Sequence, residues 1–340
     1  MRRSDFEYEL PAELIAQTPL AQRSASRLLV LDADLEDSCC LMLPQLLRPL
    51  DLLVFNDTRV LPARLAARRA SGGRVEIFLE RALAGRGALV QARSSNALQP
   101  GETLASDGGP LQLVAQHADL WEIRLPAPAH EFFERHGAVP LPPYIARAPD
   151  AADRERYQSL LARVPGAVAA PTASLHFDQP LLDQLQARGV ERTTLTLHVC
   201  AGTFQPVREP DLDRHVMHAE HYEIGSAAIE AIGRARRAGG RVIAVGTTVA
   251  RALESAAAGD ALRSGAAETT LFVRPGFRFR VIDGLLTNFH LPASTLLMLV
   301  AALAGRERVL AAYAHAIQQR YRFFSYGDAM LIWPAPGARA

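Results

Sequence analysis

Asp51-Leu-Leu-Val-Phe-Asn-Asp57 is an apolar run that ends in two polar side chains, the pattern of a buried β-strand. Two further apolar runs, residues 27–32 and Arg241-Val-Ile-Ala-Val-Gly246, have a similar length and character. Helical segments that stop at glycine occupy residues 180–187 and 226–238. This alternation of buried strands with helices predicts an α/β fold.

Three further helices are expected from local signals. Residues 41–50 are typical of a short helix, and Thr247 and Thr248 are expected to cap a helix that runs to about residue 258. Pro292 is expected to begin another helix, with Ser294 in its first turn.

The composition changes after the first of these strands. From about residue 66 to 125, short β-like runs are separated by Gly, Ser, Asn and Pro clusters, which favours a small barrel. A Pro-rich stretch at 139–145 is the expected return linker. We therefore expect residues 1–65 and 150–340 to form one discontinuous α/β catalytic domain. Residues 66–149 would be an inserted β-barrel domain with its return linker.

Composition excludes several classes of protein. The 340 residues are 49% hydrophobic and 21% charged, which excludes a disordered chain, and a net charge of +1 argues against a general polycation that coats nucleic acid. The chain contains no lysine, so Schiff-base and P-loop lysine chemistry are excluded. Three cysteines make no disulfide framework. The first residues lack a secretory h-region, and no apolar run has the length of a membrane span, so we expect a cytoplasmic protein.

Polar residues that follow the apolar strands are the first candidates for a site. Asn56, Asp57, Thr58 and Arg59 come at the end of one strand, where ligands bind in open α/β sheets. A strand-end turn with Asp57 as an Asx cap explains the same residues equally well. Similarly, the Thr247–Thr248 turn could seat an anion at a helix N-terminus or be ordinary capping.

Histidines mark two further segments. His198 precedes a turn that contains Gly202 and Thr203, where exposed amides could hold an anion or a nucleobase edge, although a lone strand histidine is more often a core residue. Residues 215–223 form the densest cluster of titratable groups. Its spacing matches no standard zinc signature, so acid–base chemistry by His218 or Glu220 needs less coincidence than metal binding.

The C-terminal third adds two polar stretches. Residues 287–295 place Asn288 and His290 in a polar patch immediately before a helix. Residues 321–330 interleave aromatic side chains with Arg322 and Asp328, a composition that could stack on bases and contact phosphate. The alternative for this last stretch is an aromatic lid packed on the core.

Taken together, these segments resemble the S-adenosylmethionine:tRNA ribosyltransferase-isomerases of queuosine biosynthesis. The resemblance runs nearly end to end, over residues 5–11, 53–64, 73–77, 140–145, 165–177, 246–254, 287–300 and 321–332. One departure is visible, because the family usually has glycine where this chain has Cys200. A cysteine there is strained if the position needs a positive φ.

The resemblance implies a larger α/β domain interrupted by a small β-barrel, and an unusual reaction. The ribosyl part of the co-substrate S-adenosylmethionine would pass to the aminomethyl group of a 7-deazaguanine at the wobble position of a tRNA. Adenine and methionine would leave, giving epoxyqueuosine. No metal and no membrane are expected, and the protein is expected to be a monomer.

The roles of individual residues are hypotheses that also rest on the resemblance. The residues expected to take part in catalysis are His198, His218, Glu220 and Asp57. Those expected to bind S-adenosylmethionine are Asn56, Thr58, Gly202, Thr203, Thr247, Thr248, Asn288, His290 and Asp328. Those expected to contact the tRNA substrate are Arg59, Arg64, Arg322 and Tyr326.

Two alternatives from other classes stay open. One is a metal-dependent hydrolase that uses the His215–His221 cluster. The other is a non-catalytic RNA-binding module built from the small β domain and the aromatic tail, which would retain tRNA without releasing adenine.

Overall fold

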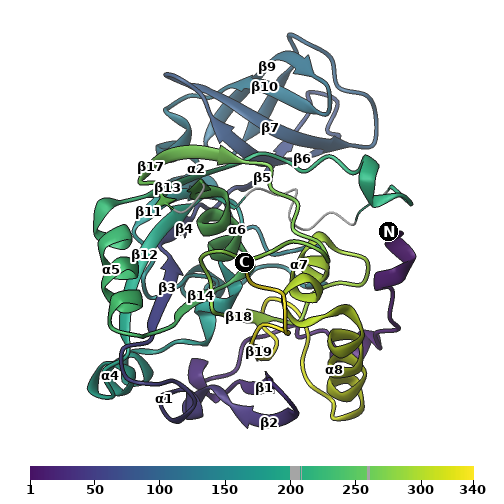
Figure 1. Cartoon of the computed structure of the whole chain (residues 1–340). Coiled ribbons are helices and arrows are strands. Elements are labelled where there is room, and N and C mark those ends of the chain that lie inside the picture. The colour runs from purple at the N-terminus through teal and green to yellow at the C-terminus, as the bar shows by residue number, and fades with distance from the viewer. Residues whose placement is uncertain (200–206, 208, 259–260) are drawn as a thin grey trace.

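A large β-sheet lies at the centre of the larger part of the protein (Figure 1). The computed structural model describes residues 1–199, 207, 209–258 and 261–340. Within them the sheet has nine strands, in the spatial order β17 (Gly265–Thr269), β13 (Glu220–Ile224), β12 (Glu191–Leu197), β3 (Leu52–Asn56), β14 (Val242–Val245), β18 (Gly284–Asn288), β19 (Ala329–Ile332), β1 (Arg27–Leu31) and β2 (Leu35–Cys39). Strands β12, β3, β14 and β18 pair in parallel, so their carboxyl ends meet at one edge of the sheet.

Helices cover both faces of this sheet. Successive residues of β3 face opposite sides: Leu52 and Val54 belong to one apolar cluster, and Leu53 and Phe55 to another. The first cluster packs under α5 (Ser226–Arg237), α6 (Thr247–Ala256), α7 (Thr295–Ala304) and α8 (Arg306–Gln318). The second packs under α1 (Leu43–Leu46) and α4 (Gln179–Ala187). Burial on both faces explains why residues 52–55 of this strand are all apolar.

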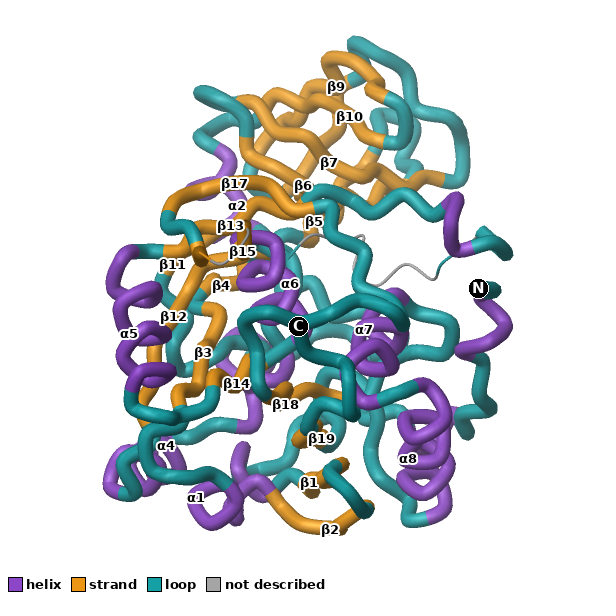
Figure 2. The backbone as a smooth tube through the Cα atoms, viewed as in Figure 1, coloured by secondary structure: helices purple, strands orange, loops and turns teal. Residues whose placement is uncertain are grey.

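A six-stranded closed barrel is inserted between β3 and β12. Its strands, in spatial order, are β10 (Leu120–Arg124), β7 (Gly87–Ser94), β6 (Arg74–Ala82), β5 (Arg64–Arg68), β8 (Thr103–Ser106) and β9 (Gly109–His117). Alternate residues fill its interior, and Phe132 and Phe133 of α2 (Ala129–His136) join that core. Figure 2 shows the barrel as strands at the top of the view, with most helices in the part below it. The predicted α/β fold with a small inserted β-barrel is therefore confirmed.

Short elements connect these parts. Two strand pairs are β4 (Thr58–Val60) with β11 (Val164–Ala167), and β15 (Ala257–Ala258) with β16 (Ala261–Leu262). One turn of helix, α3 (Asp153–Arg156), follows the Pro-rich return. The 3₁₀ helices are η1 (Arg3–Phe6), η2 (Ala12–Leu14), η3 (Arg23–Ala25), η4 (Cys40–Met42), η5 (Thr172–His176) and η7 (Leu212–Arg214). Among the helices of the described ranges, none has both the length and the apolar character that a bilayer span needs.

Three helix boundaries differ from the prediction. The helix expected over residues 41–50 is only η4 followed by one turn, α1, which ends at Leu46. Helix α7 begins at Thr295 rather than Pro292, because the Ser294 side chain accepts a hydrogen bond from the amide of Leu297 and so caps it. At α6 the cap position is Gly246, whose φ of 102° suits glycine, and Thr247 and Thr248 form the first turn instead.

Candidate functional site

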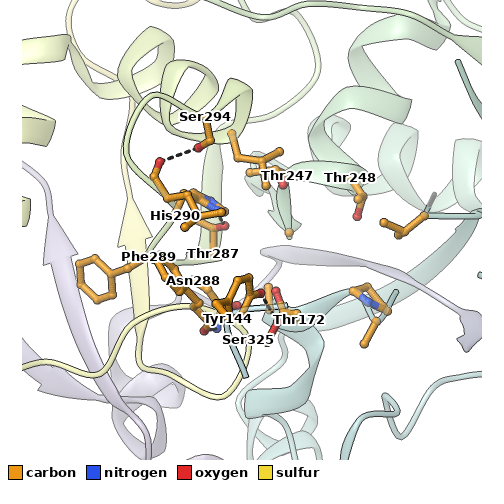
Figure 3. A pocket seen from close by; sticks show the side chains of 18 residues that line it. Tyr144, Thr172, Thr247, Thr248, Thr287, Asn288, Phe289, His290, Ser294 and Ser325 are labelled. Atoms are coloured by element: carbon orange, nitrogen blue, oxygen red, sulfur yellow. Dashed lines mark hydrogen bonds between the residues drawn. The ribbon is translucent and has the colours of Figure 1, made fainter. Parts of the chain in front are cut away.

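A pocket opens at the carboxyl ends of β14 and β18 (Figure 3). It contains about 660 Å³ of empty space, part of it open to solvent. Its walls come from six stretches of the chain that are far apart in sequence. The lining residues are Tyr144, Ala170, Pro171, Thr172, Ala173, Val199, Gly246, Thr247, Thr248, Thr287, Asn288, Phe289, His290, Leu291, Ser294, Leu296, Phe324 and Ser325. This is the edge of an open α/β sheet at which ligands bind.

Helix α6 supplies one wall of the pocket. Strand β14 ends at Val245, Gly246 turns the chain, and Thr247 and Thr248 follow in the first helical turn. Free backbone amides at a helix N-terminus favour anions or hydrogen-bond acceptors. The Thr248 hydroxyl is buried, and within the described residues it has no hydrogen-bond partner. A buried hydroxyl without a partner is costly, so this atom is available to a ligand.

Strand β18 supplies the opposite wall. The Asn288 amide nitrogen donates to the carbonyl of Phe324 at 3.0 Å, and the Asn288 side chain also interacts with the buried ring of His176. Three hydroxyl groups bond to His290. The Thr287 hydroxyl contacts its ring nitrogen Nε2, the Tyr8 hydroxyl donates to its backbone carbonyl, and the Tyr313 hydroxyl accepts from its backbone amide. Burial lowers the pKa of His290 to about 3, so its ring is neutral near pH 7 and acts as a hydrogen-bonding group.

Four other residues that line the pocket were not predicted from the sequence. The Tyr144 hydroxyl lies 2.7 Å from Ser325 Oγ, and both residues line the pocket together with Thr172 and Phe324. Tyr144 and Thr172 belong to stretches that match the family pattern, 140–145 and 165–177, and that match was the only signal for them. The structure brings these residues together with Thr247, Thr248, Asn288 and His290.

His198 lies at the same sheet edge, next to the pocket residue Val199, but is not itself one of the lining residues. Its Nδ1 lies 2.8 Å from the Thr58 hydroxyl. Its ring packs over Gly166, where an added Cβ would lie 2.5 Å from the imidazole. Burial, and then the neighbouring His221, lower the pKa of His198 below its ordinary value. The ring is therefore neutral at pH 7 and able to accept a proton.

Asn56 and Asp57 are occupied in joining strands and lie outside the pocket. Asn56 exchanges hydrogen bonds with the backbone of Leu197, at 2.8 and 3.0 Å, which ties the end of β3 to the end of β12. The Asp57 carboxylate accepts from the hydroxyls of Thr194 and Thr196 and from Arg163. These bonds satisfy the polar groups internally, which favours the strand-end interpretation of this segment.

The His215–Glu223 cluster is dispersed by the fold. Glu220 begins β13 and forms a buried ion pair with Arg251 of α6, the two side chains being 3% and 5% exposed. His218 is exposed, and the His215 ring packs on Phe272. Among the described residues, no group of three or more His, Cys, Asp or Glu is arranged to hold a metal ion. The metal-dependent hydrolase therefore gains no support.

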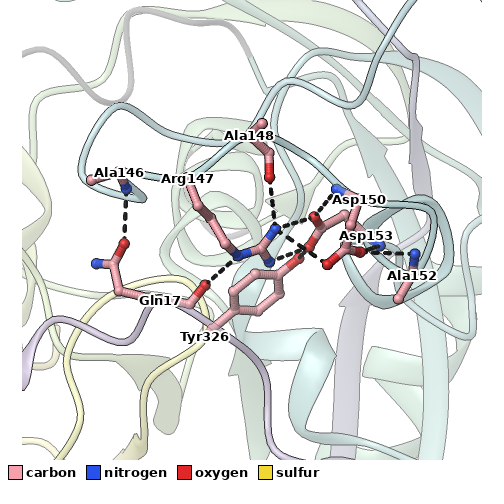
Figure 4. A network of polar contacts seen from close by, with 8 residues as sticks. All are labelled: Gln17, Ala146, Arg147, Ala148, Asp150, Ala152, Asp153 and Tyr326. Atoms are coloured by element: carbon pink, nitrogen blue, oxygen red, sulfur yellow. Dashed lines mark hydrogen bonds and ion pairs between the residues drawn. The ribbon is translucent and has the colours of Figure 1, made fainter.

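Asp328 and Tyr326 are likewise engaged inside the protein. Asp328 accepts from the backbone amides of Arg27 and Arg322, which closes the C-terminal turn. The Tyr326 hydroxyl donates to Asp153 at 2.8 Å, and Asp153 forms a two-bond pair with Arg147 (Figure 4). This network ties the Pro-rich return to the C-terminal turn, so Tyr326 is part of the packed core.

The remaining predicted residues lie elsewhere. Arg59 pairs with Glu134 at 3.6 Å, Arg64 pairs with Glu76 on the barrel, and Arg322 donates to the carbonyl of Thr18. Gly202 and Thr203, together with Cys200, lie outside the described residues.

Comparisons with known proteins agree with this architecture. The family described as queuosine biosynthesis protein matches residues 3–332. Proteins named S-adenosylmethionine:tRNA ribosyltransferase-isomerase are 57% identical in Acidithiobacillus ferrooxidans, over all of both chains, and 55% identical in Xanthomonas euvesicatoria, over 98% of this chain and 97% of that one. The crystal structure of an S-adenosylmethionine tRNA ribosyltransferase from Thermotoga maritima is 34% identical, covers 96% of this chain and 99% of its own, and superposes with a TM-score of 0.57.

Proposed function

Because the chain belongs to the queuosine biosynthesis protein family and is a transferase and isomerase, we propose that it moves the ribosyl part of S-adenosylmethionine onto a tRNA base. The acceptor is the aminomethyl group of a 7-deazaguanine at the wobble position. The ribosyl group is isomerised during transfer, and the product is epoxyqueuosine. The reaction takes place in the cytoplasm, on a monomeric enzyme.

The bonds of this reaction balance without an oxidant or reductant. The sulfonium acidifies a proton on the neighbouring ribose carbon, and a base removes it. The glycosidic bond to adenine breaks and the sugar opens. The substrate amine then forms the new bond to a ribosyl carbon, and expulsion of methionine closes the epoxide. Adenine leaves with a proton, and one proton is released overall.

The residues that line the pocket support the proposal that S-adenosylmethionine binds there. No arginine lines the pocket in the described residues, although the chain has 37 basic residues and all are arginine. Two aromatic side chains do line it, those of Tyr144 and Phe324, whereas the ring of Phe289 packs in the core (Figure 3). A sulfonium is repelled by a guanidinium and attracted by aromatic faces, so this lining suits S-adenosylmethionine.

Two polar atoms give the same pocket a means of orienting its ligand. Thr248 Oγ1, which has no partner in the described residues, can donate or accept a hydrogen bond, and the second lone pair of Asn288 Oδ1 can accept one beside His176. The N-terminus of α6 suits the methionine carboxylate. We assign Thr247, Thr248, Asn288 and His290 to co-substrate binding on these grounds.

His198 is the best supported of the proposed bases. Its lowered pKa leaves the ring neutral at pH 7, and the Thr58 hydroxyl fixes its orientation. Glu220 is already paired with a buried guanidinium, and His218 is exposed before β13 begins. A neutral and oriented imidazole meets the needs of general-base catalysis better than either.

The direct test incubates the protein with S-adenosylmethionine and tRNA that carries the aminomethyl precursor. We expect free adenine and methionine in equal amounts, together with a tRNA whose mass increases by the transferred group. A tRNA with unmodified guanine at the wobble position is the control and should yield no adenine. Binding of tRNA without adenine release would support the RNA-binding module instead, and a methylated nucleoside would contradict ribosyl transfer.

Replacing Thr248 with valine should weaken binding of S-adenosylmethionine while leaving the fold as stable or more stable. The hydroxyl has no protein partner in the described residues, so its removal deletes only a ligand contact. One hydrogen bond contributes about 0.5–1.5 kcal/mol, which corresponds to a rise in Kd of roughly two- to tenfold. Calorimetric titration and thermal melting measure the two effects.

Thr196→Val is the matched control. This buried threonine donates to Asp57 at 2.6 Å, so the same change should lower the melting temperature and leave co-substrate affinity unchanged. A Thr248→Val protein that binds S-adenosylmethionine normally would remove this hydroxyl from the site.

A further inference from the structure

A groove runs between the barrel and the Pro-rich return. It contains about 1890 Å³ of empty space, including open solvent. One wall is formed by strands β5 and β6 together with residues 105–107, which include the carboxylate of Asp107, and the other by residues 138–149. The two walls are joined where Arg64 pairs with Ala138 through backbone hydrogen bonds. This groove is separate from the co-substrate pocket and contains none of its lining residues.

Two arginines in this groove face each other without a counterion. Arg68 of β5 and Arg74 of β6 are directly opposite in the antiparallel register, and both are exposed. Neither has a carboxylate within ion-pair distance in the described residues. By contrast, Arg64 pairs with Glu76, and Arg147 pairs with Asp153. Like charges directly opposite on a sheet repel each other, so this pair gives the groove a local positive charge.

The groove lies on the other side of the segment that lines the pocket. Tyr144 lines the co-substrate pocket, whereas its neighbours Pro143 and Ile145 line the groove. A polynucleotide chain in the groove is therefore separated from the pocket by a single stretch of backbone. An enzyme that modifies a base within a folded RNA turns that base into its site while the flanking backbone stays on the surface.

We propose that this groove binds the phosphodiester backbone of the RNA substrate, and that Arg68 and Arg74 contact phosphates next to the modified nucleotide. The proposal rests on the function proposed above. Guanidinium groups match phosphate geometry, and two of them opposite each other can hold adjacent phosphates. Bound phosphate also relieves the repulsion between the two arginines. The contacts fix the position of the RNA and do not read its sequence.

The test compares Arg68→Gln/Arg74→Gln with the native protein, using precursor-bearing tRNA. We expect the Kd for tRNA at low salt to rise by roughly tenfold or more, and the slope of log K against log salt to flatten by about 1.5. The KM for tRNA should rise similarly, whereas the Kd for S-adenosylmethionine and the rate at saturating tRNA should not change.

Arg81→Gln/Arg86→Gln is the matched control, since it removes the same charge from exposed arginines of the barrel that do not line the groove. It should change tRNA affinity by less than threefold. Native-like tRNA binding by the groove variant, or equal losses in both variants, would overturn the proposal. Arg68→Lys/Arg74→Lys should recover part of the affinity if the contacts are to phosphate. Native protein that binds tRNA but releases no adenine would contradict the proposed function instead.

Discussion

His198→Ala protein should release adenine about 10²- to 10⁴-fold more slowly than native protein in a single turnover, which is the usual contribution of a general base. The imidazole is buried enough to be neutral at pH 7 and is oriented by Thr58, so its loss removes a proton acceptor that water replaces poorly. Binding of S-adenosylmethionine should stay within threefold, because the groups assigned to hold the co-substrate are Thr247, Thr248, Asn288 and His290, and His198 is assigned only the proton transfer. Quenched-flow sampling of adenine measures the rate.

The pH profile separates a base from a packing residue. A base is active when it is neutral, so the native rate should be level at pH 7 and fall as the pH drops below the lowered pKa of His198. His221 is exposed and its ring lies 6.4 Å from that of His198, where it helps to lower this pKa. His221→Ala should therefore move the acid limb to higher pH and leave the plateau unchanged. A single-turnover rate unaffected in His198→Ala would exclude His198 from the chemistry.

The fold could be predicted largely because its strands are buried on both faces. The strands β3, β14 and β1 each contain four consecutive apolar residues, and the glycines that follow α4 and α5 mark where those helices stop. Such signals are local in the sequence. The predicted boundaries of α1 and α7 were wrong. The start of α7 depends on which side chain caps its first turn, and the end of α1 depends on where the backbone becomes extended toward the next strand.

The candidate site could be predicted only in part. Thr248 follows a buried strand, and its hydroxyl has no partner among the residues that the structure describes. Asn56 and Asp57 occupy an equivalent place after β3, yet their polar atoms are satisfied by β12. Sequence alone does not distinguish these two cases, because the difference lies in tertiary partners more than a hundred residues away. Tyr144 has no local signal at all.

Replacing Glu220 with alanine should lower the free energy of unfolding by about 3–5 kcal/mol, one of the largest effects expected from a single substitution in this chain. Glu220 and Arg251 are almost completely buried, and their side chains form an ion pair that joins β13 to α6. Removing the carboxylate leaves the guanidinium buried without its counterion. Arg251 Nε keeps its bond to the carbonyl of Leu271, but a neutral carbonyl does not replace the lost counterion, and Nη2 has no hydrogen-bond partner in the described residues. Urea unfolding followed by circular dichroism measures the change.

The double variant Glu220→Leu/Arg251→Met tests whether this loss comes from an uncompensated charge. Replacing both partners of a buried pair with apolar residues is often neutral or stabilising, so this protein should recover most of the stability. A third variant, Glu220→Gln, decides whether Glu220 has a catalytic role. An ion-pair role predicts that folded Glu220→Gln protein releases adenine at a rate close to the native one, whereas a general base at this position predicts a loss of at least a hundredfold with unfolding little changed. Because α6 carries Thr248 in its first turn, displacement of this helix by the unpaired Arg251 should also weaken S-adenosylmethionine binding in Glu220→Ala, and the double variant should restore it.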